Sequence, residues 1–201
     1  SLEPEEMDYE VLERLSLQEK LCPQFHLSLQ SGCDATLKRM NRHYDTHEYY
    51  EIVSNIRKLF KNPSITTDIM VGFPGESDEE FNQSLEFVKK VGFSKVHVFS
   101  YSRRPGTKAD LEKDQILNSV KAIRSKKMIE ATNESRLNFL NSQVGTKHSV
   151  LFENLRNNGY YEGYTTNYVP VLVKSEDNLS GKILNTLIES VNEGVCFGRI
   201  L

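Results

Sequence analysis

Polar and cationic side chains stand at the ends of two apolar segments, where they can hold a ligand. Gln30 and Ser31 close a weakly alternating segment that begins at Phe25. Arg103 and Arg104 follow a second such segment. Amide and hydroxyl groups hydrogen-bond ligands, and a guanidinium holds a carboxylate or phosphate through two parallel bonds. These residues are therefore candidates for a ligand site; the alternatives are backbone capping at the first end and ordinary solvation at the second.

Two further pairs have helical spacing. Lys38 and Arg42 lie four residues apart in a helix that we expect to begin at Asp34, so they should share one face. We expect Arg42 to bind an anion, with a solvated basic face as the alternative. His43 and His47 also have the spacing of a metal pair, but no third ligand is evident, so we expect surface residues and no metal site.

A glycine-rich turn lies at the centre of the predicted fold. Ile65–Val71 is a β-branched, mostly apolar run without alternation, which predicts a parallel strand buried on both faces. Gly72 and Gly75 then break the strand, and Ser77 and Glu80 have the capping-box spacing of a helix start. The carboxyl end of a parallel strand is where such folds bind ligands, although an ordinary tight turn has the same local pattern.

The elements around this turn alternate between helix and strand, which predicts parallel strands joined by right-handed crossovers. A long helix should follow, with Ile116, Val120, Ile123 and Leu137 facing a core. After Gly145, short strands separated by turns predict a small closed barrel, so we place a domain boundary between residues 142 and 143. The predicted helices are 4–15, 34–42, 45–60, 77–91 and 113–141, and the predicted strands are 25–30, 65–71, 94–101, 150–152, 159–164, 169–173, 182–188 and 195–201.

Composition limits the classes of function. The chain has 201 residues and a formal net charge of −3, which gives no general attraction to nucleic acid or anionic membrane, and no apolar run reaches membrane-spanning length. Cys22, Cys33 and Cys196 are few and far apart, which argues for a reducing compartment, and we expect a cytoplasmic protein. Because the chain opens with Ser-Leu-Glu-Pro, which is typical of a strand leading into a helix, we expect a piece of a longer protein.

Five short sequence segments, which follow one another in a fixed order, resemble those of a known family. Together they resemble the radical S-adenosylmethionine methylthiotransferases, the MiaB, RimO and MtaB family, over nearly the whole chain. The wording of the last segment is most similar to the MtaB branch. The segments are residues 1–4, 26–32, 37–44, 67–76 and 96–107.

The resemblance implies an α/β fold: a partial TIM-like radical SAM barrel with parallel strands over 1–142, and a small all-β TRAM barrel over 143–201. It implies that the intact enzyme adds a methylthio group to C2 of N6-threonylcarbamoyladenosine next to the tRNA anticodon, with the anticodon stem-loop as partner and no membrane. The alternatives are the ribosomal-protein aspartate or isopentenyladenosine methylthiotransferases of this family, or a non-catalytic RNA-binding module. Oligomeric state is left open.

The family uses S-adenosylmethionine and two 4Fe-4S clusters, one of them held by a C-x-x-x-C-x-x-C run. That run is absent here, so we expect no cluster to be bound by this chain and no activity from it alone. The resemblance places Gln30 and Ser31 near the ribose and amino-acid part of S-adenosylmethionine, and Val71 and Gly72 against its adenine. Arg42 would bind the cofactor carboxylate or an RNA phosphate.

The remaining candidates would contact substrate. Arg103 and Arg104 would meet a phosphate or the threonylcarbamoyl carboxylate. In the terminal barrel, aromatic rings can stack on unpaired bases, and we expect two tyrosines of this cluster to be exposed while others fill the core. From residue 143 on, five positive and six negative side chains give a net charge of −1, which predicts weak autonomous RNA binding or a local basic patch. The barrel candidates are Lys147, Tyr160, Tyr161 and Tyr164, and Tyr168 belongs to the same tyrosine cluster.

Overall fold

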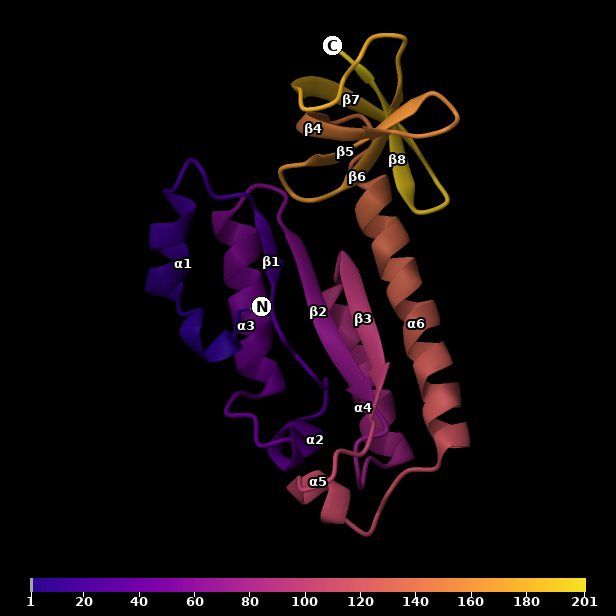
Figure 1. Cartoon of the computed structure of the whole chain (residues 1–201). Helices are drawn as coiled ribbons and strands as arrows, with labels where there is room; N and C mark the ends of the chain where they lie inside the picture. Colours follow the sequence, from indigo (N-terminus) through magenta and orange to yellow (C-terminus); the bar gives the residue numbers. More distant parts are fainter. Residues whose placement is uncertain (1) are drawn as a thin grey trace.

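The computed structural model describes residues 2–201 as a helix-covered parallel sheet and a β-barrel, linked by a long helix (Figure 1). The barrel lies beyond the amino ends of the sheet strands, and the short helices α2 and α5 lie near their carboxyl ends. The elements before the barrel are η1 (Pro4–Glu6), α1 (Tyr9–Ser16), β1 (Gln24–His26), α2 (Asp34–Arg39), α3 (Thr46–Leu59), β2 (Ser64–Val71), α4 (Asp78–Val91), β3 (Lys95–Ser100), α5 (Lys108–Leu111) and α6 (Asn118–Asn141).

The sheet has the order β1-β2-β3 within the described residues, and both pairings are parallel, as predicted. The helix starts predicted at Asp45 and Ser77 are also confirmed, because both residues form complete capping boxes. Gly92 ends α4 in the left-handed conformation, with φ +64°. Local sequence signals therefore set the boundaries of the helices that flank β2.

Burial of β2 differs from the prediction that both of its faces are covered. Ile65 and Ile69 are buried beneath the helices, whereas Thr66, Asp68 and Met70 on the opposite face are only partly covered. The helices pack on one side of the sheet, so the other side is open. Because alternate strand residues point to opposite faces, the polar members of β2 line this open face.

Helix α6 buries a different face from the one predicted. It begins at Asn118 rather than Lys113, and Ile123 on its supposed core face is 57% exposed. Leu137, expected to face a core, is likewise exposed. The prediction is wrong because α6 packs against β3 and α4 through a face whose Lys121 and Arg124 bind the Tyr101 carbonyl and Glu76. Its buried residues are Lys121, Arg124, Met128, Thr132 and Leu140.

The barrel closes in the order β4-β5-β6-β8-β7 across the described residues, which confirms the predicted closed barrel. Its neighbouring strands are antiparallel except for the parallel pair β6–β8. A core separate from that of the sheet fills it, built around side chains such as Phe152, Val171 and Ile188. The strands are β4 (Lys147–Leu155), β5 (Tyr160–Thr165), β6 (Pro170–Lys174), β7 (Ile183–Asn192) and β8 (Val195–Ile200).

Barrel closure requires a residue without a side chain at Gly163. A Cβ atom there would lie 2.4 Å from the backbone oxygen of Leu151 and 2.8 Å from a methyl group of Val150. We expect Gly163→Ala to lower the free energy of unfolding by about 3 kcal/mol, because backbone atoms must move to admit the methyl group. Urea unfolding measures the change. Gly159→Asn is the control, because a Cβ at Gly159 meets open space and asparagine tolerates its φ of +79°.

Buried amide side chains join the barrel to the sheet. Asn62 Nδ2 donates to Gln143 Oε1 at 2.6 Å, and Asn167 Nδ2 donates to the backbone oxygen of Asn62 at 3.0 Å. Gln143 Nε2 donates in turn to the carbonyl of Phe139 in α6 at 3.0 Å. Gln143 and Asn167 are buried, so their amide groups cannot hydrogen-bond to solvent, and these bonds satisfy them instead. The network fixes the barrel relative to the loop before β2.

Candidate functional site

A pocket of about 460 Å³ lies at the carboxyl ends of β2 and β3. Its volume is in the range of small-molecule sites, and aromatic and aliphatic side chains make up much of its wall alongside a few polar groups. Its position agrees with the rule that parallel α/β folds bind ligands at the carboxyl ends of their strands. The lining residues are Met70, Phe73, Phe99, Ser100, Tyr101, Ser102, Arg104, Thr107 and Ala109.

The two predicted arginines have different environments. Arg103 is bound within its own loop, since its Nε donates to Asp110 Oδ1 at 2.7 Å and its Nη2 to the Asp110 carbonyl at 2.8 Å. Arg104 lines the pocket, and its guanidinium has no hydrogen bond or ion pair with residues 2–201. A free guanidinium beside a pocket binds a carboxylate or phosphate. The geometry therefore favours Arg104 over Arg103 as the anion-binding residue.

An unsatisfied hydroxyl marks the same pocket. Tyr101 is 9% exposed, and its buried hydroxyl oxygen has no hydrogen-bond partner among the described residues. Phe73 packs edge-on against its ring at 5.3 Å between centroids, and Lys121 Nζ donates to its backbone oxygen at 3.0 Å. Buried polar atoms are nearly always paired in folded proteins. The Tyr101 hydroxyl is thus an unpaired polar atom in the wall behind the pocket, closed off from solvent.

A buried ion pair fixes the glycine-rich loop beside the pocket. Glu76 Oε2 accepts from the backbone N of Gly72 at 2.8 Å and from Arg124 Nη1 at 2.7 Å. Arg124 Nη2 also donates to Asp78 Oδ1 at 2.8 Å. Burial raises the pKa of Glu76, while the Gly72 N–H and Arg124 act in the opposite direction. Glu76 therefore has a structural role in this loop.

The residues expected near the cofactor differ in accessibility. Gln30 is half-buried, and its φ is +67°. Two hydrogen bonds to β2 hold this backbone: Gln30 N donates to Asp68 O at 2.9 Å, and Gln30 O accepts from Met70 N at 2.8 Å. Such a conformation is costly for a non-glycine residue and often occurs at functional sites. Ser31 is buried, and its hydroxyl accepts from the backbone N of Cys33 at 3.3 Å. Gln30 is thus the better placed of the two for a ligand.

Val71 and Gly72 end β2 with little free space around them. Val71 is buried, and Gly72 has φ +72°. A Cβ at Gly72 would lie 2.4 Å from Lys121 Cγ, so the aliphatic part of Lys121 occupies the space that glycine leaves. The absence of a side chain at Gly72 therefore allows α6 to pack closely against the end of β2.

The shared helical face predicted for Lys38 and Arg42 is wrong. Helix α2 ends at Arg39, and Asn41 turns the chain with φ +58°, so Arg42 leaves the helix axis. Arg42 Nη1 instead contacts Glu3 Oε2 at 3.4 Å, in a partly exposed ion pair. Arg42 remains a prediction as an anion-binding residue, without the help of Lys38.

A polar cluster on the open face of the sheet was not predicted. His26 Nδ1 lies 2.9 Å from Thr66 Oγ1, and its Nε2 lies 3.3 Å from Asp68 Oδ2. His97 is paired in register with Asp68, and burial lowers the pKa of its imidazole. The missed signal is the period-two placement of these side chains on three strands, which brings them to one face once the register is known.

The barrel candidates separate into core and surface. Tyr161 is 6% exposed and belongs to the barrel core, so its prediction as an RNA-contacting residue is corrected. Strand alternation explains the difference, because Tyr160 beside it is half-buried and packs edge-on against Phe197. Tyr164 stacks on Tyr168 with ring centroids 4.8 Å apart. Lys147 is exposed on β4.

An iron–sulfur cluster does not fit the residues described here. Cys22 is exposed, whereas Cys33 and Cys196 are buried in different parts of the fold. Among residues 2–201, no three His, Cys, Asp or Glu side chains gather in a way that could hold a metal ion. A cluster needs several thiolates close together, so no step of the chemistry is assigned to one in this chain.

Comparison with known proteins identifies the family. Residues 2–88 match the Radical SAM superfamily. The chain is 35% identical over 98% of its length to tRNA-2-methylthio-N(6)-dimethylallyladenosine synthase of Finegoldia magna. It is 37% identical over 84% of its length to threonylcarbamoyladenosine tRNA methylthiotransferase MtaB of Thermotoga maritima. The chain belongs to the radical S-adenosylmethionine methylthiotransferase family.

This chain covers part of those family members: 43% of the Finegoldia magna protein and 39% of the Thermotoga maritima protein. The fold is also shared with coproporphyrinogen III oxidase (HemN) of Escherichia coli, a radical SAM enzyme, at a TM-score of 0.58 and 15% identity over 82% of this chain and 45% of that one. The partial radical SAM barrel expected from the sequence is thereby confirmed. None of the helices between residues 2 and 201 is long and apolar enough to cross a membrane.

Proposed function

We propose that this protein methylthiolates C2 of an N6-modified adenosine next to the tRNA anticodon, with N6-threonylcarbamoyladenosine as its substrate. Residues 1–142 would form part of the radical SAM domain and 143–201 the TRAM domain. The observation that carries the proposal is the pocket at the carboxyl ends of β2 and β3, where the free guanidinium of Arg104 stands beside apolar walls.

The residues of this chain would bind and orient rather than react. S-adenosylmethionine would supply the radical chemistry of this family when it is bound. The amide of Gln30 would bind the cofactor at the strand end. Met70 and Phe99 would hold the adenine of the substrate by apolar contact.

The substituent on N6 is where two substrates differ. A threonylcarbamoyl group carries a carboxylate, which Arg104 can bind bidentately. A dimethylallyl group is apolar, and the Met70 and Phe99 side chains offer it a surface. The Finegoldia magna relative is named for the dimethylallyl substrate, so this is the second candidate.

A reconstituted preparation of the intact protein distinguishes the two substrates. It would be incubated with S-adenosylmethionine, a reductant and tRNA carrying either N6-threonylcarbamoyladenosine or N6-dimethylallyladenosine. Mass spectrometry of the digested nucleosides should show methylthio addition to the threonylcarbamoyl substrate. Modification of the dimethylallyl substrate alone would assign the second candidate, and modification of neither would refute the proposed function.

A further inference from the structure

We propose that the junction between the barrel and the amino ends of β2 and β3 is an RNA-binding surface. Tyr168 would stack on an unpaired base there, and Lys95 and Arg136 would contact the flanking phosphates. The inference rests on the proposed function, in that the substrate is an RNA. It assigns the contact to three residues that come from the barrel, the sheet and α6, rather than to the barrel alone.

The backbone of Tyr168 is strained in a way that presents its ring. Its φ is +62°, a conformation that disfavours a bulky residue, and its backbone N donates to Thr165 O at 2.9 Å within the turn. Its side chain is 65% exposed, so the strain does not serve burial. One face of the ring stacks on Tyr164, at an interplanar angle of 18°. A strained, exposed aromatic residue at a turn indicates a functional contact.

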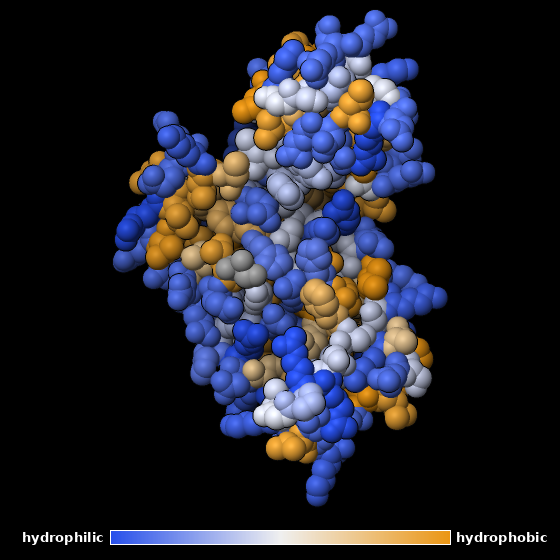
Figure 2. Space-filling model, viewed as in Figure 1, coloured by the Kyte–Doolittle hydropathy of each residue, from blue (hydrophilic) through white to orange (hydrophobic). Residues whose placement is uncertain are grey.

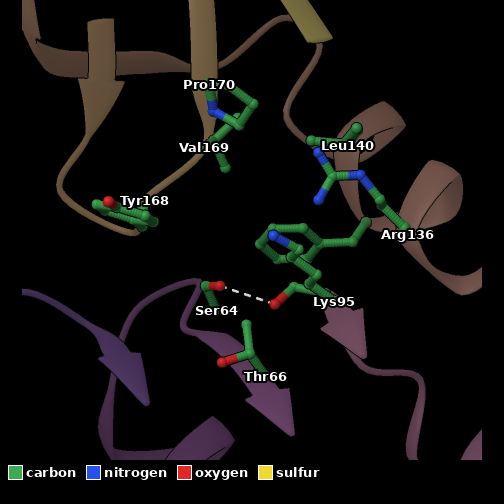
Figure 3. Close-up of a pocket in the computed structure, with 10 residues that line it drawn as sticks. Ser64, Thr66, Lys95, Arg136, Leu140, Tyr168, Val169 and Pro170 are labelled. Atoms are coloured by element: carbon green, nitrogen blue, oxygen red, sulfur yellow. Dashed lines mark hydrogen bonds between the residues drawn. The ribbon is translucent and has the colours of Figure 1, made fainter. Parts of the chain in front are cut away.

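Lys95 and Arg136 line one small pocket together with Tyr168, and Arg136 lies on the side of the pocket opposite the Tyr168 ring (Figure 3). Lys95 is exposed at the start of β3. Arg136 comes from α6, and its Nη2 donates to Gly194 O at 3.1 Å, which leaves other N–H groups of its guanidinium for a ligand. Aromatic stacking combined with basic side chains is the usual arrangement for binding single-stranded nucleic acid.

Charge distribution favours the junction over the barrel by itself. Residues 143–201 carry five positive and six negative side chains, so the barrel has no net attraction to phosphate. Lys95 and Arg136 lie outside the barrel sequence and add positive charge to the pocket that Tyr168 also lines. Figure 2 shows that hydrophilic residues predominate on the viewed face of the molecule, with apolar side chains in separate patches. A polyanion therefore suits the surface better than an apolar partner.

The buried amide network makes the arrangement of these groups rigid. Asn167 precedes Tyr168, and its side chain is fixed to Asn62, two residues before β2. The ring of Tyr168 is thereby held at a set position relative to the start of the sheet, and its contact with RNA requires no ordering of a mobile loop.

The junction and the carboxyl-end pocket lie at opposite ends of β2. The eight residues of β2 span about 23 Å at roughly 3.3 Å per residue. A stacked strand advances about 3.4 Å per nucleotide, so this distance corresponds to about seven nucleotides. An RNA loop held at Tyr168 can thus place a base several nucleotides away in the pocket beside Arg104.

RNA-binding measurements on the 201-residue chain test the inference, with an unmodified tRNA transcript as the probe. Tyr168→Asn removes the ring and relieves the backbone strain, because asparagine tolerates positive φ. We expect the thermal stability of this variant to equal or exceed that of the unchanged chain, while its Kd for the transcript rises about tenfold. Tyr168→Phe, which keeps the ring, should bind as the unchanged chain does. A loss of binding without a loss of stability separates a contact role from a folding role.

Salt dependence tests the cations. Lys95→Gln should lower the slope of log K against log salt by about one, whereas Lys126→Gln, on the exposed side of α6, should leave it unchanged. Equal affinities for Tyr168→Asn and the unchanged chain would overturn the inference, as would no RNA binding by the unchanged chain. The nucleoside assay on intact protein decides the proposed function separately.

Discussion

Replacing Glu76 by alanine is expected to lower the free energy of unfolding by about 3–5 kcal/mol. Glu76 is 2% exposed and pairs with Arg124, itself buried in α6. Without the carboxylate, the Arg124 guanidinium loses its buried partner and the backbone N–H of Gly72 loses its acceptor. Urea unfolding of the 201-residue chain, followed by circular dichroism, measures the change.

Asp78→Ala is the matched control, because Asp78 pairs with the same guanidinium but its side chain is 83% exposed. Its loss should cost less than about 1 kcal/mol, since water replaces an exposed partner. Glu76→Gln keeps an acceptor for Gly72 and should fall between the two. If Glu76→Ala and Asp78→Ala proved equally mild, the ion pair would not be what fixes the glycine-rich loop.

Substituting Arg104 by methionine in the intact protein should raise KM for the threonylcarbamoyl substrate by about 10- to 100-fold. A hydrogen bond to a charged group contributes about 1.5–3 kcal/mol, and the substrate carboxylate would lose its partner. KM for a dimethylallyl substrate should not rise, because that group has no charge to pair. Nucleoside mass spectrometry at varied tRNA concentrations measures both values.

Arg103→Met is the control for this substitution. Arg103 is bound to Asp110, so its loss should affect the loop before α5 without distinguishing the two substrates. Arg104→Lys, which keeps the charge but not the bidentate geometry, should have an intermediate KM. A KM increase of the same size for both substrates would show that Arg104 supports the pocket rather than reading the carboxylate.

Local signals predicted much of the fold because they act over a few residues. The boxes at Asp45 and Ser77, the glycine at Gly92 and the β-branched run before Gly72 each specify their own backbone. Alternation of these elements was enough to predict parallel strands, and turn residues after Gly145 were enough to predict a barrel. The sequence segments that resemble the family then predicted a ligand site at the strand ends, which is where the pocket lies.

Tertiary contacts decided what could not be predicted. The polar side chains of Lys121 and Arg124 are buried because they satisfy Tyr101 O and Glu76, a pairing that hydrophobic periodicity does not register. The cluster of His26 and Asp68 depends on strand register, and the burial of Tyr161 depends on which face of β5 turns inward. In each case the sequence of one strand or helix does not show which side chains of the neighbouring element it will meet.

The most direct test is the nucleoside content of total tRNA from cells that lack this gene, compared with cells in which it is restored. Mass spectrometry should show loss of 2-methylthio-N6-threonylcarbamoyladenosine, accumulation of the form without the methylthio group, and recovery on restoration. Unchanged amounts of both nucleosides in the deleted cells would contradict the account.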